Sequence, residues 1–330
     1  MLSGRSPAVM VMIFVLGCFL GTSGCSTPAA VLRPRTDQPW HVVATTGMVA
    51  DIVRAVVGPD GQVTALMGTG VDPHLFKPTR RDVKLLLEGD IIFYSGLMLE
   101  GRMEETFQHL ARSGKPVRAV TDGIDRNELH ELPGSPGHWD PHVWMNVAAW
   151  SQCTQFVAEA MGALDPAHAG DYQRRANEYR DHLIHLDADI RTAIGTIPAK
   201  QRVLITAHDA FGYFSTAYGI PVRSVQGVTT DSEAGISDVN DLVDFVVSHQ
   251  VPALFVESSV NPKTIQAVRE GARARGVEVH VSGELYSDAM GPAGTYEGTY
   301  PGMLDANVTR IVTALGGTIS PQGIFGKLKS

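Results

Sequence analysis

Cysteine is scarce in this chain of 330 residues, which has only Cys18, Cys25 and Cys153. If the mature chain begins at Cys25, Cys153 is the one other thiol, and neither an internal disulfide nor a cysteine-rich metal site can form. Positive charge is also in short supply, because 27 Lys and Arg stand against 35 Asp and Glu, for a net charge of −8. Without a basic field to attract phosphates, the sequence argues against nucleic acid as a partner.

Long apolar runs are also few. The run at residues 8–20 is too short for a comfortable membrane span, and no charged stop follows it. The small residues that follow it end in Cys25 and resemble a bacterial lipobox, in which the cysteine is lipidated and begins the mature chain. We therefore predict a lipoprotein signal peptide at residues 1–24. The product would be exported, either lipid-anchored at the outer face of the cytoplasmic membrane or in the periplasm.

Two alternatives to Cys25 lipidation stay open. Thr22 stands where a lipobox usually has Leu, and Val15-Leu16-Gly17-Cys18 is a competing match. We prefer Cys25 because Phe19 and Leu20 continue the apolar run beyond Cys18. The other alternative is an ordinary cleaved signal with incidental cysteines.

Residues 25–39 are polar, contain prolines and lack periodicity, which predicts a flexible tether. From Trp40 on, short apolar strands alternate with helices, the pattern of βαβ units and a parallel sheet. These elements would form an N-terminal α/β lobe over residues 40–164. We predict strands at 41–46, 62–67, 90–94 and 116–120, and helices at 48–57, 80–88, 103–111 and 147–162.

A long helical pattern follows the first lobe. Apolar residues recur at spacings of mostly three and four from Tyr172 to Ile194, which is typical of one helix face. Asp165 offers a capping side chain, Pro166 fits the first helical position, and Gly195 should end the helix. At roughly 30 residues the helix would be about 45 Å long. We predict a rigid connector at residues 165–197 that runs along both lobes; a coiled coil is the alternative, but two heptads are few for one.

The strand–helix alternation then resumes and predicts a C-terminal α/β lobe over residues 198–330. The fold class is therefore α/β, with two lobes, each a parallel sheet with flanking helices, joined by one long rigid helix. We predict strands at 202–207, 222–225, 253–256 and 277–281, and helices at 209–218, 239–249, 261–275 and 303–315.

Four residues are candidate metal ligands: His74, His142, His208 and Asp288. Each follows an apolar strand-like run or lies in a loop, so all four could gather at the carboxyl ends of strands, where open α/β sheets bind ligands. Two come from each lobe, which would place an ion in the cleft between the lobes. Three imidazoles and one carboxylate suit a borderline divalent ion such as Zn²⁺, and also Mn²⁺ or Fe²⁺.

The triplet Asp-Pro-His occurs twice, at Asp72-Pro73-His74 and Asp140-Pro141-His142. Proline stiffens the loop beside each histidine, and Asp72 and Asp140 could accept the second ring N–H of a ligating imidazole. Most other histidines have no pattern around them and are expected at the surface or in the core. His182 and His185, three apart on the connector, lack an obvious third partner for a metal.

Four stretches resemble the motifs of the metal-binding solute-binding lipoproteins of ABC transporters, the zinc/manganese group also called cluster A-I. Together, in the right order from about Trp40 to Leu315, they are highly specific. The first three carry the histidines, and the fourth carries the carboxylate. They are Asp72-Pro73-His74 with Pro78 and Asp82, Trp139-Asp140-Pro141-His142, Thr206-Ala207-His208-Asp209, and Ser287-Asp288 with Gly298-Thr299-Tyr300-Pro301-Gly302 and Asn307.

The resemblance implies that a two-lobed protein captures a metal in its cleft and delivers it to a membrane permease driven by a cytoplasmic ATPase. The implied ligands are His74, His142, His208 and Asp288, with Zn²⁺ or Mn²⁺ bound as the transported substrate by a monomer. Members associated with manganese sometimes have Glu where this chain has His208, which favours zinc. The His-rich loop of many zinc-dedicated members is absent here, since residues 121–140 hold only His130 and His138, and this weakens a zinc-only assignment.

Two other functions stay open. A zinc-dependent hydrolase could use Glu257, after the strand at 253–256, as general base, although four protein ligands would close the position that a catalytic zinc keeps for water. Cell adhesion is sometimes attached to this family, but no residue pattern supports it separately.

Overall fold

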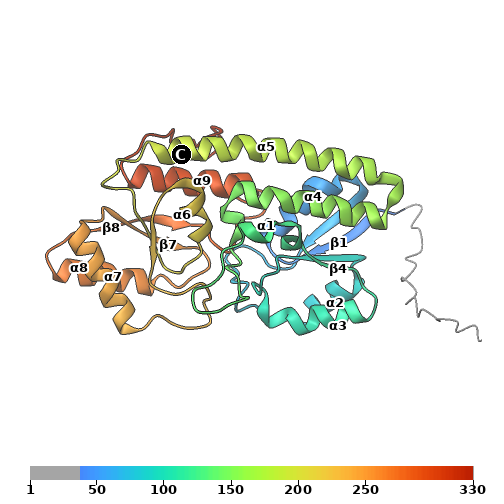
Figure 1. Cartoon of the computed structure of the whole chain (residues 1–330), viewed down its shortest axis with the longest axis horizontal. Helices are drawn as coiled ribbons and strands as arrows, with labels where there is room; N and C mark the ends of the chain where they lie inside the picture. The colour runs from blue at the N-terminus through green and yellow to red at the C-terminus, as the bar shows by residue number, and fades with distance from the viewer. Residues whose placement is uncertain (1–37, 330) are drawn as a thin grey trace, which may run out of the picture. The chain divides into compact units, whose positions relative to one another are not determined.

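A computed structural model describes residues 38–329 of the chain (Figure 1). The predicted signal peptide at 1–24, the lipidation site at Cys25 and the tether up to residue 37 lie outside the described residues. Within the described range, no helix is both long and apolar enough to cross a membrane.

A four-stranded parallel sheet, in the order β2-β1-β3-β4, organises the first half. Alternate residues of the central strand β1 face opposite sides, as the pleat requires. Val42 and Ala44 pack with helices α1 and α4, whereas Val43 packs in a separate cluster with α2 and α3. The elements are β1 (Trp40–Ala44), α1 (Gly47–Val57), β2 (Gly61–Ala65), α2 (Arg80–Glu88), β3 (Ile91–Tyr94), α3 (Glu104–Arg112), β4 (Val117–Ala119) and α4 (Val147–Leu164).

Side-chain caps begin several of these helices. Thr46 accepts a hydrogen bond from the backbone N–H of Val49 at the start of α1, and Asn146 accepts one from Ala149 at the start of α4. At α2, Thr79 and Asp82 form a reciprocal capping box. Each cap satisfies N–H groups that a helix leaves without a partner in its first turn.

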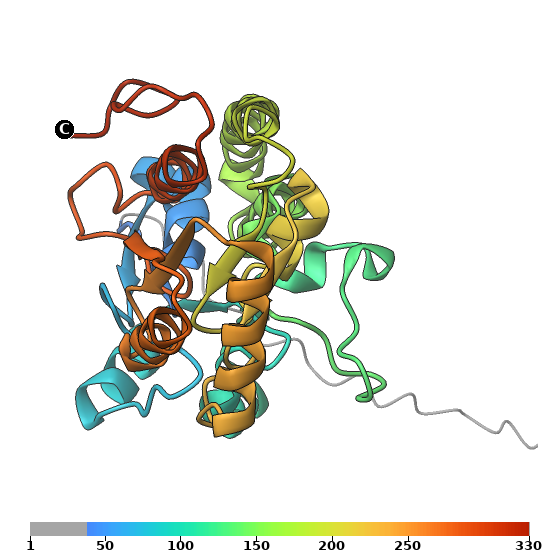
Figure 2. The same cartoon turned by 90° about the vertical axis from the view of Figure 1, so that its left-hand side faces the viewer.

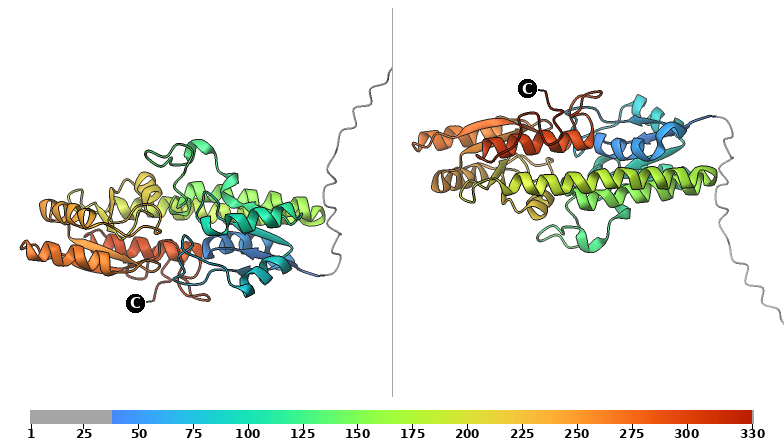
Figure 3. Two further views of the ribbon diagram at one scale, coloured as in Figure 1. Left: turned by 90° about the horizontal axis from the view of Figure 1, so that it is seen from below. Right: turned by 90° about the horizontal axis from the view of Figure 1, so that it is seen from above.

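Helix α5 (Ala169–Gly195) is the connector, and it runs past elements of both halves (Figures 1 and 3). Its 27 residues correspond to about 40 Å. It begins later than the sequence predicted, because Pro166–His168 forms a separate 3₁₀ turn. The carboxylate of Asp165 accepts hydrogen bonds from the Trp40 indole, at 3.0 Å, and from the Tyr172 hydroxyl, at 3.0 Å, instead of capping the helix.

The second half contains four short strands in two parallel pairs, β5-β6 and β7-β8, with β5 beside β7. Helices α7 and α8 lie together on the side of these strands away from α5 and α9 (Figure 2). The elements are β5 (Leu204–Thr206), α6 (Gly212–Tyr218), β6 (Val222–Ser224), α7 (Ile236–His249), β7 (Ala253–Glu257), α8 (Lys263–Ala274), β8 (His280–Leu285) and α9 (Tyr300–Ala314).

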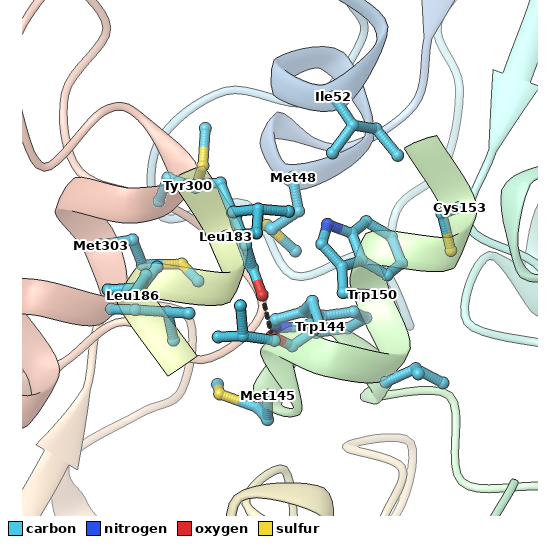
Figure 4. Packing of buried hydrophobic residues seen from close by; sticks show 14 of the residues in the cluster. Met48, Ile52, Trp144, Met145, Trp150, Cys153, Leu183, Leu186, Tyr300 and Met303 are labelled. Carbon is cyan, nitrogen blue, oxygen red and sulfur yellow. Dashed lines mark hydrogen bonds between the residues drawn. The ribbon is translucent and has the colours of Figure 1, made fainter. Parts of the chain in front are cut away.

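One hydrophobic cluster continues through both halves (Figure 4). Trp144 and Trp150 of the first half pack with Leu183 of α5 and with Tyr300 of α9. The Tyr300 hydroxyl donates a hydrogen bond to the carbonyl of Trp144, at 2.7 Å, and the Trp144 indole donates one to the carbonyl of Ser287, at 2.9 Å. The predicted two-lobed α/β class is confirmed, and these contacts show that the lobes share a core.

Candidate metal centre

The two Asp-Pro-His triplets adopt the same local turn. Asp72 Oδ1 accepts a hydrogen bond from the backbone N–H of His74, and Asp140 Oδ1 accepts one from the backbone N–H of His142, each at 2.9 Å. Such turns are a usual way for Asp to fix the backbone two residues further on. Sequence repetition thus produces a repeated loop, and each loop presents one histidine.

His208 and Asp288 come from the second half. His208 follows β5, and its backbone N–H and that of Ala207 both donate to Glu257 Oε1, at 2.9 and 2.7 Å. Asp288 follows β8 in a segment that Asn307 holds, because the Asn307 side chain bonds both the N–H and the carbonyl of Tyr286. Both residues therefore sit on backbone that is tied to neighbouring elements of the second half.

The structure brings His74, His142, His208 and Asp288 together so closely that one ligand atom from each lies within 4.8 Å of the others. Nε2 of His142 lies 3.3 Å from Nε2 of His74 and 3.3 Å from Asp288 Oδ1. Nε2 of His208 lies 3.1 Å from Asp288 Oδ2. The exposed fractions are 5% for His74, 0% for His142 and His208, and 1% for Asp288, so the four groups face one another and not solvent.

Carboxylates hold the far nitrogens of two of these rings. Nδ1 of His142 lies 2.7 Å from Asp140 Oδ1, and Nδ1 of His208 lies 2.5 Å from Glu257 Oε2. A carboxylate at Nδ1 keeps a proton there and leaves Nε2 as the ligand atom. Asp72 differs: its other oxygen accepts from the Thr230 hydroxyl, and no hydrogen bond among the described residues joins Asp72 to the His74 ring.

The electrostatics of the cluster divide the three histidines. Burial, helped by the other two rings, lowers the pKa of His74 to about 4 although Asp288 opposes the shift. Burial also disfavours the charged form of His142, but Asp140 and Asp288 outweigh it and raise its pKa to about 9. For His208, Glu257 and Asp288 likewise overcome burial and hold the pKa well above its usual value. Burial alone would raise the pKa of Asp288, but His208 and His142 outweigh burial and hold this pKa well below its usual range.

The polar atoms of the cluster are incompletely satisfied by the protein itself. Five buried atoms at the cluster make no aligned hydrogen bond with any described residue, although they lie at ion-pair distances: both oxygens of Asp288, both ring nitrogens of His208, and Glu257 Oε2. Buried polar atoms normally have partners. Three imidazoles and a carboxylate that converge in this way form a ligand set for a borderline divalent ion.

The remaining histidines lie elsewhere. His182 and His185 are exposed on α5, and among the described residues no other group of three or more His, Cys, Asp or Glu could hold a metal. The sequence alone suggests that Glu257 is either a general base or a structural carboxylate. Its place at His208 Nδ1 depends on the pairing of β7 with its neighbours, which no local pattern reveals. No pattern in the sequence points to Thr230, which reaches Asp72 from the second half.

A two-lobed α/β scaffold with a buried His₃Asp cluster between its lobes defines the class of metal-binding proteins that serve ABC transporters. The chain belongs to the family of the periplasmic zinc-uptake complex component A (ZnuA), whose profile matches residues 42–314.

Relatives and solved structures agree with this assignment. The chain is 43% identical over 316 residues to the manganese-binding lipoprotein MntA of Bacillus subtilis, covering 96% of this chain and 100% of that one. It is 42% identical over 315 residues to the zinc-binding protein TroA of Treponema pallidum, covering 96% and 99%. The solved structure of the periplasmic zinc-binding protein TroA from Treponema pallidum matches with a TM-score of 0.81 and 44% identity, over 84% of this chain and 99% of that one.

The family membership also decides between the function classes left open by the sequence. The family consists of substrate-binding components of transporters, not enzymes. A zinc-dependent hydrolase with Glu257 as general base therefore has no support. In the structure Glu257 Oε1 accepts two backbone N–H groups, and Oε2 lies at ion-pair distance from His208 Nδ1.

Proposed function

We propose that His74, His142, His208 and Asp288 bind a divalent transition metal as cargo, and that this chain hands the ion to an ABC permease driven by its ATPase. The convergence of four buried ligand atoms, two from each lobe, is the observation that carries the proposal. Asp140 and Glu257 support it by holding the far nitrogens of two rings. Asp72 takes part differently, through the backbone of His74.

The cargo is Zn²⁺ or Mn²⁺. Three imidazoles and one carboxylate accept either ion, and the similar relatives carry both names, manganese-binding for MntA and zinc-binding for TroA. His208 in place of a carboxylate favours zinc, because an imidazole is a softer ligand than a carboxylate. Among residues 38–329 no second group of three or more His, Cys, Asp or Glu could hold a metal, so nothing beyond the four ligands adds to the preference for zinc.

The protein would work outside the cytoplasm as a lipid-anchored monomer. Lipidation at Cys25, followed by the tether at 25–39, is supported by the lipoprotein names of MntA and the PsaA relatives. The lobes would span 40–164 and 198–330, joined by the connector at 165–197. No residue pattern supports cell adhesion separately from exposure at the cell surface, so the proposal is limited to metal capture.

A competition titration tests the proposal. The metal-stripped protein is titrated with Zn²⁺ and Mn²⁺, separately and against each other, beside His208→Ala and the exposed control His182→Ala. One tight site that His208→Ala weakens by orders of magnitude and His182→Ala leaves unchanged is the expected result. Equal effects of the two substitutions, or no tight site, would refute the ligand assignment.

A further inference from the structure

The buried metal centre borders a cavity of about 390 Å³ to which both lobes contribute. Of the four proposed ligands, His74 is the one that lines it. A second cavity, of about 290 Å³, lies on the Asp288 side of the centre. These cavities offer two directions by which an ion could reach or leave the centre. The first is lined by His74, Met98, Arg102, His138, Thr229 and Asp231.

The first cavity is bordered by a loop of the second lobe, residues 226–232, here named the crossing loop. It follows β6 and is held at its base by a hydrogen bond from the backbone N–H of Gln226 to the carbonyl of Ala207, at 2.9 Å. At its far end it reaches the first lobe through two side-chain contacts. The Thr230 hydroxyl donates to Asp72 Oδ2 at 2.6 Å, and Arg102 Nη2 donates to Asp231 Oδ1 at 2.5 Å.

These two contacts differ in strength. Thr230 is buried, 9% exposed, and its acceptor is a partly buried carboxylate, so this hydrogen bond is of the charge-assisted kind that contributes most. The side chains of Arg102 and Asp231 are 36% and 49% exposed, so their ion pair is weaker and is screened by salt. The hydrogen bond from Thr230 to Asp72 is thus the stronger of the two contacts between the crossing loop and the first lobe.

Asp72 links this hydrogen bond directly to a proposed ligand. One of its oxygens accepts from Thr230, and the other accepts from the backbone N–H of His74. A carboxylate shared in this way couples the position of the crossing loop to the loop that presents His74.

We propose that the crossing loop is the latch of the metal centre, and that Thr230 and Asp231 are positioning residues that set the rate of metal exchange. The inference rests on the proposed function. His142, His208 and Asp288 are at most 1% exposed, so an ion passes only after some part of the protein moves. The hydrophobic core runs unbroken through both lobes, which opposes a wide opening of the lobes. Breaking the two side-chain contacts between the crossing loop and the first lobe should cost less free energy than separating the lobes.

The chain offers a matched control on the other side of the centre. Thr69 of the first lobe donates a hydrogen bond to the carbonyl of Gly291 in the second, at 3.2 Å, and both residues line the second cavity. Thr230→Val and Thr69→Val therefore each remove one hydroxyl that joins the lobes, on opposite sides of the ion. They distinguish the two directions of exchange.

The test is stopped-flow release of Zn²⁺ from the loaded full-length protein into excess chromogenic chelator, with rates extrapolated to zero chelator. Thr230→Val should speed release roughly tenfold, the order expected for one lost hydrogen bond to a charged group, and should speed uptake as well, so that Kd changes less than either rate. Thr230→Ser, which keeps the hydroxyl, should restore the wild-type rate. Asp231→Asn should speed release by a smaller factor that shrinks as salt is added.

The outcomes separate this inference from the function on which it rests. A wild-type protein without tight Zn²⁺ binding would overturn the proposed function itself. Tight wild-type binding with unchanged release from Thr230→Val would overturn the latch, and so would faster release from Thr69→Val alone, because exchange would then pass the second cavity. If Thr230→Val does not fold, Asp231→Asn decides: release at the wild-type rate at low salt would overturn the proposal.

Discussion

Binding of a divalent ion at neutral pH should displace about two protons from the metal centre. The pKa of His142 is raised to about 9 and that of His208 is raised well above its usual value, so we expect both rings to hold a proton at Nε2 at pH 7. The pKa of His74 is lowered to about 4, so this ring is already neutral. Because a ligating imidazole must give up the proton on its ligand atom, His142 and His208 each release one proton when the ion binds, and His74 releases none.

The proton count fixes how steeply affinity depends on pH. Each displaced proton changes the apparent affinity tenfold per pH unit, so two protons correspond to about 100-fold, or about 2.7 kcal/mol, for each unit of pH. Affinity should fall with this slope as the pH drops from 8 toward 6. Above about pH 9 the slope should decrease, because His142 has then lost its proton before the ion arrives.

Isothermal titration in two buffers of different ionisation enthalpy measures the released protons directly. Asp140→Asn should lower the count toward one, because it removes a carboxylate that raises the pKa of His142. His182→Ala should leave the count at two, since His182 is exposed on α5. Release of no protons at pH 7, or a count that Asp140→Asn does not change, would refute the reasoning.

Three further predictions concern stability. In the metal-free protein the raised pKa of His142 stabilises the fold by about 3 kcal/mol. This contribution is fully present below pH 6.5, the usual pKa of histidine, and is lost as the pH rises through about 9. Urea unfolding at pH 6 and pH 9.5 measures it, and an equal free energy of unfolding at the two pH values would contradict it. Leu183→Ala in the shared core should lower the free energy of unfolding by about 2–5 kcal/mol, measured by urea unfolding, whereas Ile184→Ala on the exposed face of α5 should change it by far less. Thr79→Ala should cost about 1 kcal/mol by removing the α2 cap; a loss as large as that of Leu183→Ala would show that the capping box does more than begin one helix.

Local signals predicted much of this structure. The strand–helix alternation placed the elements, and the repeated Asp-Pro-His triplet led to Asp140 as the partner of the His142 ring, which lies at 2.7 Å. Some helix starts were set too late although their signals were present. α9 begins at Tyr300, with Thr299 as the cap and Pro301 in the first turn, three residues before the predicted start at Met303.

Other features depend on tertiary contacts that a sequence pattern does not contain. Asp165 resembles a helix cap but instead bonds Trp40, which is 125 positions away in the chain. Asp72 and Asp140 stand in identical triplets, yet their contacts differ. Asp140 Oδ1 bonds both the backbone N–H and the ring of His142, whereas Asp72 bonds the backbone N–H of His74 and, through Oδ2, Thr230 of the other lobe. Glu257 joins His208 through the neighbourhood of β5 and β7.

The core that continues from Trp144 through α5 to Tyr300 means that the lobes are not interchangeable modules. A chimera that takes one lobe from a relative would also need the faces of α5 and α9 that pack against that lobe. Otherwise it would bury mismatched side chains throughout the shared core. Splitting the chain into two fragments at the connector would likewise leave each with an uncovered apolar face. The natural unit for engineering a new metal preference is therefore the set of loops around the ion, on an otherwise intact scaffold.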